Sequence, residues 1–220
     1  MEKLIVNTNL REQIYDILKN MIVHREIQPG EKINEERVAK ETGVSRTPIR
    51  DALCRLENEK IIEMIPRRGA FVIRQTEATI REVLEIREVL EGLVTRLATI
   101  HMNEKTLGQL TKCLEKIRSV PDEGRYLMKY TQSDIRFHSI LLEACRNSML
   151  QNMMATTNTH LQIIRLRTVV LPGRAKKTVE EHYEILKAIE TGDEDSAETM
   201  MRKHVESVRR DSIKNLESMV

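Results

Sequence analysis

The sequence of 220 residues contains no tryptophan, and its aromatic residues make up only 3% of the chain. Proteins that bind single-stranded nucleic acid stack the bases on aromatic side chains, so this composition argues against that mode of binding. The net charge is only +2. Composition therefore does not indicate nucleic acid by itself, and any such function depends on where the arginines lie.

Cysteine is also scarce, and the spacing of Cys54, Cys113 and Cys145 matches no zinc or redox motif. An odd number of cysteines without such a motif predicts reduced thiols. The N-terminus lacks the apolar core of a signal peptide, and no run is long and apolar enough to span a membrane. We therefore expect a cytoplasmic protein without membrane contact.

Two short helices separated by a glycine are predicted after residue 33. Asn34 is a good N-cap for the first, and Gly43 suits the end of that helix. Ser45 or Thr47 caps the second helix, and Pro48 is tolerated in its first turn. The second helix has one apolar stripe: Ile49, Ala52, Leu53 and Leu56. Such a pair is a helix-turn-helix, whose second helix enters the DNA major groove.

The exposed side of the second predicted helix carries Arg46 and Arg50, which lie one turn apart. Both side chains can therefore reach base edges, and arginine pairs bidentately with guanine. A further helix starting near Asn9 is expected to pack across this pair and complete a three-helix unit.

A β-hairpin is predicted next, because two β-prone runs at residues 61–65 and 70–73 flank a turn containing proline and glycine. A hairpin behind a recognition helix is a wing. Arg67 and Arg68 at its tip are candidates for contact with phosphate or the minor groove. The alternative is a solvated basic helix and loop without a DNA partner.

Residues 45–53, with Arg37 upstream and residues 68–72 downstream, resemble the winged helix-turn-helix of GntR-type bacterial transcription regulators. The resemblance implies base contacts by Arg37, Arg46 and Arg50, backbone contacts by Ser45 and Thr47, and wing contacts by Arg68 and Gly69. A single small helix-turn-helix buries little surface on double-stranded DNA. We therefore expect a homodimer on a palindromic operator.

The remaining chain shows helical periodicity throughout. We predict a mostly α fold with a winged helix-turn-helix over residues 1–74, a linker over 75–78, and an all-α antiparallel bundle over 79–220. The bundle should contain about six helices. Expected helix starts include Thr79, Asn103 and Thr178, and a heptad-like apolar pattern follows the first of them at Val83, Ile86, Leu90, Leu93 and Leu97.

Four polar residues interrupt the apolar faces of these helices. Asp134 and His138 lie one turn apart, while His182 and His204 lie at similar distances from the turn near Gly192. Because burying such groups is costly unless they are satisfied, a shared divalent metal is the simplest partner. Zn suits this set best, and Ni, Mn and Fe are possible. The alternative is four separate, hydrogen-bonded core residues.

This set resembles the metal ligands of the FadR subfamily of GntR regulators, in its FCD-type ligand domain. The resemblance implies a small carboxylate effector beside the metal, and the expected function is that of a repressor. Arg87 either clamps the carboxylate or forms an ion pair with Glu91. Arg165 and His160 are further candidates for effector binding, with core packing as the alternative for His160.

The alternative functions are a metal-dependent enzyme and a direct metal sensor, each fused to a DNA-binding unit. The sequence has no His-Glu-x-x-His motif, and no Glu lies three residues before His182 or His204 as di-iron bundles require. We therefore expect a ligand-responsive transcription regulator and not an enzyme.

Overall fold

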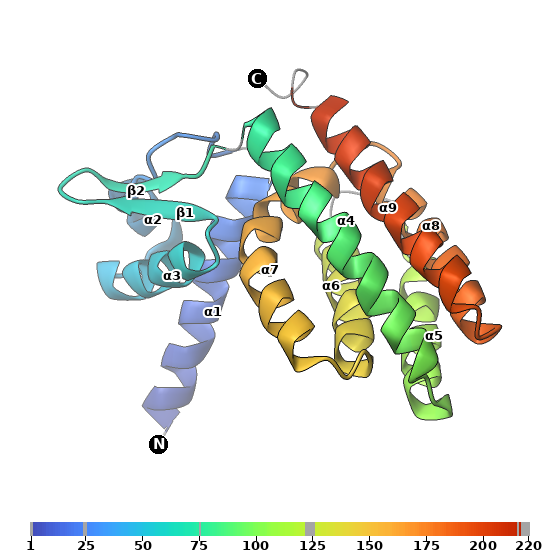
Figure 1. Cartoon of the computed structure of the whole chain (residues 1–220). Coiled ribbons are helices and arrows are strands. Elements are labelled where there is room, and N and C mark those ends of the chain that lie inside the picture. The colour runs from blue at the N-terminus through green and yellow to red at the C-terminus, as the bar shows by residue number, and fades with distance from the viewer. Residues whose placement is uncertain (1, 24–25, 75, 122–125, 215, 217–220) are drawn as a thin grey trace. The chain divides into compact units, whose positions relative to one another are not determined.

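The structure, a computed structural model, describes the backbone of residues 2–23, 26–74, 76–121, 126–214 and 216. Of residues 2–9, 23, 156–160, 162–163 and 166–167 it describes the backbone alone. The chain divides into two compact units, Met1–Gln75 and Thr76–Val220 (Figure 1).

The first unit is the predicted winged helix-turn-helix. Its elements are α1 (Glu2–Val23), α2 (Glu35–Thr42), α3 (Arg46–Asn58), β1 (Ile62–Ile65) and β2 (Gly69–Val72). Helix α1 begins well before Asn9, where we predicted its start. No glycine or proline interrupts the residues before Asn9, so the helix continues through them.

Local signals set the two helices of the helix-turn-helix. The side chain of Asn34 accepts hydrogen bonds from the backbone N–H groups of Glu36 and Arg37, both at 3.0 Å. Gly43 ends α2 with a φ of 69°, a left-handed conformation that costs glycine little. The predicted stripe of α3 is buried, whereas Ser45 occupies the N-cap position without a capping hydrogen bond from its side chain.

The wing is an antiparallel hairpin in which Ile62 pairs with Val72 and Ile65 pairs with Gly69. Ile62 and Val72 are both buried, so their side chains fix the wing against the core of its unit. Gly69 has a φ of 101°, which lets the chain leave the tight turn. The arginines of the turn, Arg67 and Arg68, are exposed at the tip.

The second unit is all helical over its described residues. Its helices are α4 (Glu77–Ile100), α5 (Glu104–Arg118), α6 (Leu127–Ala144), α7 (Ser148–Thr168), α8 (Arg174–Glu190) and α9 (Glu194–Lys214). Helix α4 packs along α9 and also contacts α6 and α7 (Figure 1). Asn103 caps α5 as predicted, and Gly192 turns the chain between α8 and α9. None of the helices that the structure describes has the length and hydrophobicity to cross a membrane.

Two predicted helix starts are wrong. Thr76 caps α4 by accepting a hydrogen bond from the backbone N–H of Thr79, so the helix already includes the last two residues of the predicted linker. Helix α8 begins at Arg174, four residues before Thr178, after Gly173 in a left-handed conformation. Arg174 is buried and forms an ion pair with Glu181, about two turns farther along the same helix. This ion pair holds the additional turn in the bundle.

The heptad-like pattern of α4 marks its buried face only in part, since Val83, Leu90 and Leu97 are partly buried against the core. Ile86 and Leu93 are exposed, at 56% and 38%, whereas Arg87 and Glu91 are buried at 2% and 1%. The helix has apolar residues on two sides, and the side that includes the charged pair is the one that faces the bundle. Apolar periodicity alone could not distinguish the two faces.

Candidate metal centre and DNA-binding surface

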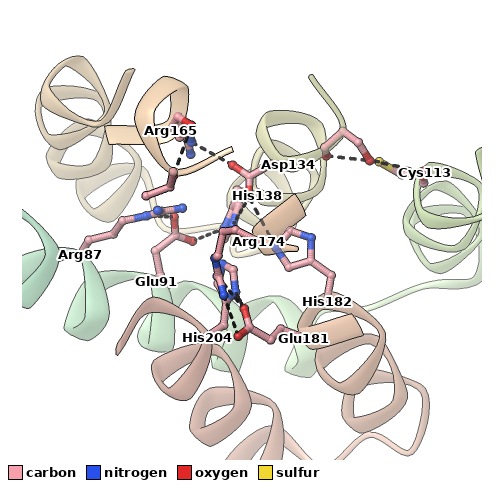
Figure 2. A network of polar contacts seen from close by, with 12 residues as sticks. Arg87, Glu91, Cys113, Asp134, His138, Arg165, Arg174, Glu181, His182 and His204 are labelled. Atoms are coloured by element: carbon pink, nitrogen blue, oxygen red, sulfur yellow. Dashed lines mark hydrogen bonds and ion pairs between the residues drawn. The ribbon is translucent and has the colours of Figure 1, made fainter. Parts of the chain in front are cut away.

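Three helices bring the predicted metal ligands together. Asp134 and His138 lie one turn apart on α6, while α8 supplies His182 and α9 supplies His204 (Figure 2). One ligand atom from each side chain lies within 4.8 Å of all the others. Four donors about 2.1 Å from one divalent ion would be roughly 3 to 4 Å apart, so the observed cluster requires only small adjustments.

The histidine rings have unused nitrogens within this cluster. Nε2 of His138, of His182 and of His204 is buried without a hydrogen-bond partner among the described residues. The Oδ1 atom of Asp134 is 3.6 Å from Nε2 of both His138 and His182. Buried polar atoms in native proteins are nearly always satisfied. Three unsatisfied imidazole nitrogens beside a carboxylate therefore fit a metal ion, which would take all four groups as ligands.

Two further carboxylates orient the rings. Nδ1 of His138 is 2.9 Å from Glu91, and Nδ1 of His204 is 2.7 Å from Glu181. An ionised carboxylate only accepts hydrogen bonds, so each Nδ1 carries the proton and donates it. Each Nε2 of these rings then offers a lone pair to the cluster, which is the arrangement of metal-ligating histidines.

The charges of the site favour metal binding. Burial acts against ionisation of Asp134, but His138 and Arg165 hold the pKa of this carboxyl well below its ordinary value. Burial lowers the pKa of His182, and the neighbouring rings of His204 and His138 lower it further. An ionised carboxylate and a neutral imidazole are the forms that ligate metals.

His138 differs from the other two rings. Burial acts to lower its pKa, but the nearby carboxylates of Glu91 and Asp134 outweigh burial and raise the pKa above its ordinary value. A histidine binds a metal only through an unprotonated nitrogen, so protonation of His138 and metal binding compete.

Buried arginines surround the cluster. Nε of Arg165 donates to Oδ2 of Asp134 at 3.0 Å, and Nε of Arg87 donates to Glu91 at 3.1 Å. Arg87 is thus the ion-pair partner of Glu91, one of the two alternatives left by the sequence. Its Nη2 remains buried without a hydrogen-bond partner in the described part of the chain.

A pocket adjoins the candidate metal ligands. Asp134 and His182 line it together with Arg87, Arg165 and Arg174. This arrangement places three guanidinium groups beside two of the candidate metal ligands. The side chain of His160, the remaining effector candidate, lies outside the described residues.

The candidate DNA contacts lie on exposed surface of the first unit. Arg37, Ser45, Arg46, Thr47 and Arg50 are all exposed. The wing candidates are Arg68, whose guanidinium lies over the Phe71 ring, and Gly69 at the start of β2. The structure thus presents Arg46 and Arg50 at the N-terminal end of α3, Arg37 on α2, and the wing candidates on the hairpin.

Comparison with known proteins assigns both units. Residues 10–72 match the gntR family of bacterial regulatory proteins, and residues 82–207 match the FCD domain. The chain belongs to the GntR family of transcriptional regulators and carries an FCD domain. The regulator is 31% identical to the gluconate operon transcriptional repressor of Bacillus licheniformis, over 81% of this chain and 74% of that protein.

Other relatives support the same assignment. The transcriptional repressor RspR of Escherichia coli K12 is 27% identical over 90% of this chain and 87% of its own. Among solved structures, E. coli McbR/YncC has a TM-score of 0.61 at 20% identity, covering 95% of this regulator and 97% of that chain. The Zn²⁺-bound FCD domain of TM0439 has a TM-score of 0.51 at 24% identity, covering 66% of this chain and 99% of that one. The family consists of regulators and not of enzymes.

The sequence did not reveal three residues that orient the site. From the sequence, Glu91 is expected only as a partner of Arg87, and Glu181 and Arg174 have no expected role at the site. Arg174 is buried and donates to Glu181, Ser207 and Asp211. The only available signal was that charged residues recur on otherwise apolar helix faces, as for the histidines.

The candidate metal centre predicts linked losses of metal binding and stability. Zn²⁺ at about 100 times its Kd should raise the free energy of unfolding by roughly 2.7 kcal/mol, because the ion binds only the folded protein. His182→Ala and His204→Ala should abolish most of this gain. Thermal unfolding with and without Zn²⁺ measures it, and His101→Ala, outside the site, is the matched control. No gain in the parent protein with either Zn²⁺ or Ni²⁺ would contradict the site.

Proposed function

We propose that this GntR-family regulator is a dimeric repressor whose operator binding is controlled by a small carboxylate bound at a divalent metal in the FCD domain. The observation that carries the proposal is the cluster of three buried, unpartnered imidazole nitrogens beside Asp134. The Zn²⁺-bound FCD domain of TM0439, which shares the fold, supports a metal here. Relatives named as repressors support the direction of regulation.

The four ligands suit a particular group of ions. Three imidazoles and one carboxylate favour Zn, while Ni, Mn and Fe accept the same donors. When bound, such an ion supplies a positive centre to which a carboxylate oxygen binds. Glu91 and Glu181 hold the rings of His138 and His204 in the ligating orientation, which this function requires.

The charge around the pocket favours an anionic effector. Salt bridges connect equal numbers of cationic and anionic side chains there: Arg87, Arg165, Arg174 and Lys177 with Glu91, Asp134, Glu181 and Asp211. Because these charges cancel, a divalent ion would leave the pocket with an excess positive charge. A small hydroxy or keto acid would neutralise it, with Arg87 or Arg165 beside its remaining oxygens.

A dimer is supported by the outer face of α4. Ile86, Val89 and Leu93 follow one another at spacings of three and four residues and are 56%, 53% and 38% exposed. Ile100, one heptad after Leu93, extends the stripe and is 53% exposed. A stripe of this kind on a single helix packs well against its own copy around a two-fold axis. The second copy also supplies the second winged unit that a palindromic operator requires.

The DNA-binding assignment predicts the effect of two substitutions. Arg46→Ala or Arg50→Ala should weaken binding to the preferred sequence by about 1–3 kcal/mol and relax sequence preference, because each removes a bidentate base contact. Binding by gel shift against a duplex selected from a random library by the parent protein measures the change. Arg136→Ala removes an exposed arginine from the other unit and should have no effect. Unchanged binding by both recognition-helix variants would show that the helix is misassigned.

The effector should bind together with the metal. Lactate, pyruvate and gluconate provide a test panel of hydroxy and keto acids. An acid that completes the metal's coordination should bind the metal-loaded protein more tightly than the chelator-treated protein, and it should raise metal affinity by the same factor. Calorimetry measures the affinity of the acid for the metal-loaded and the chelator-treated protein, and the affinity of the metal with and without the acid. Equal affinity in both states would leave the metal a structural element only, and a change of DNA binding with metal alone would indicate a metal sensor.

The α4 stripe predicts the oligomeric state. Val89→Glu and Leu93→Glu place a charge in the proposed interface and should convert the dimer to a monomer in analytical ultracentrifugation. Affinity for a palindromic duplex should fall in parallel. Met64→Glu replaces an exposed apolar residue of the wing strand β1 and should leave the dimer intact. A dimer that persists in both α4 variants would exclude this face.

A further inference from the structure

The two arginines at the start of the recognition helix do not extend freely into solvent. Nη2 of Arg46 lies 2.8 Å from Glu36, and Nε of Arg50 lies 3.3 Å from Glu35. Both acids belong to the first turn of α2, directly after its N-cap Asn34. The helix-turn-helix therefore places two adjacent carboxylates against two of the three arginines expected to read bases.

Each ion pair occupies only part of its guanidinium. An arginine has five N–H donors in a fixed fork, and bidentate recognition of guanine uses two of them. With Nε of Arg50 directed at Glu35, its two Nη groups remain for a base. Arg46 likewise keeps Nε and Nη1 outside its contact with Glu36. The side chains are 66% and 60% exposed, so these remaining donors face solvent and, in a complex, DNA.

Binding to the preferred sequence and binding to other DNA affect these ion pairs differently. On the preferred sequence each arginine can contact guanine while its acid holds it in place, which reduces the conformational freedom lost on binding. On any other sequence the arginine can contact a phosphate only by leaving its acid, and the freed carboxylate would then lie near the negatively charged backbone. The ion pair therefore competes with the phosphate contact. The acids therefore oppose non-specific binding more strongly than specific binding.

We infer that Glu35 and Glu36 are specificity-determining residues, which position Arg50 and Arg46 for base contact and repel DNA that offers only phosphates. They act through the arginines and contact no base themselves. The inference rests on the DNA-binding function of the family and on these distances. It does not depend on the metal, the effector or the dimer interface.

If the two acids only stabilised helix α2, removing one would change the non-specific DNA affinity in the opposite direction. Carboxylates in the first turn of a helix also stabilise it through the helix dipole. If that were their only contribution, removing one would loosen α2 and weaken specific and non-specific binding together. The sign of the change in non-specific affinity thus separates the two explanations.

The chain offers a matched control for the loss of charge. Glu12 pairs with Arg55 at 2.7 Å, and both side chains are exposed. Arg55 is nine residues beyond Arg46 on the same helix, about 13 Å farther along its axis. Glu12→Gln therefore removes the same charge and the same kind of ion pair from the same unit, away from the base-reading end.

The experiment compares Glu35→Gln and Glu36→Gln with Glu12→Gln in the full-length protein. The probes are a duplex selected from a random library by the parent protein and a scrambled duplex of the same composition, each measured over a range of salt concentrations. Each α2 variant should bind the scrambled duplex about threefold more tightly than the control variant does, since exposed ion pairs are worth a factor of this order. The ratio of specific to non-specific affinity should fall correspondingly.

Salt dependence gives an independent measure. An arginine released to a phosphate adds one contact, so the slope of log affinity against log salt on the scrambled duplex should steepen by about one. The inference would be overturned if the ratio of specific to non-specific affinity and the salt slope changed no more in the α2 variants than in Glu12→Gln. A parallel loss of both affinities, with a lower melting temperature, would assign the acids to helix stability alone and would overturn it equally.

Discussion

Burying a charged or polar group costs free energy unless a partner satisfies it, and the FCD domain buries several such groups in one place. The rings of His138, His182 and His204 meet there, with Arg87 and Glu91 behind them at 2% and 1% exposure. Each bond in this network satisfies one group and orients the next, as Glu91 does between Arg87 and His138. The three Nε2 atoms are where the described network ends, and a bound cation would complete it.

Helix α4 connects this network with the rest of the regulator. Its inner face contributes Arg87 and Glu91 to the buried cluster, and its outer face carries the exposed apolar stripe. Its first residues follow directly on the winged unit, after the N-cap Thr76. A ligand that shifts the inner face therefore acts on the element that also holds the proposed dimer contact. Only a ligand with different affinity for the two arrangements of the winged units can change DNA binding.

Signals from residues close in the chain predicted the winged unit well. Asn34, Gly43 and the stripe of α3 each act within a few residues, so the sequence contains all the information needed. The four candidate metal ligands could be predicted because polar residues on apolar helix faces are rare, and the structure brings them together. The partners of the rings were missed because Glu91 lies 47 residues from His138 and Glu181 lies 23 from His204. Pairings over such separations depend on the packing of helices, which periodicity does not specify.

Breaking an arginine–glutamate ion pair costs a different free energy in the two units because the pairs differ in burial. Arg87 and Glu91 are almost fully buried, so removing one partner leaves an uncompensated charge in the core, a loss of roughly 3–5 kcal/mol. Arg46 and Glu36 are 60% and 78% exposed, and breaking such a pair costs about 1 kcal/mol or less. Pairs in the FCD domain are therefore suited to hold a site rigid. Pairs on the winged unit are weak enough to break where the DNA offers only phosphates, so in our proposal their contribution appears in the choice of DNA sequence and not in the stability of the fold.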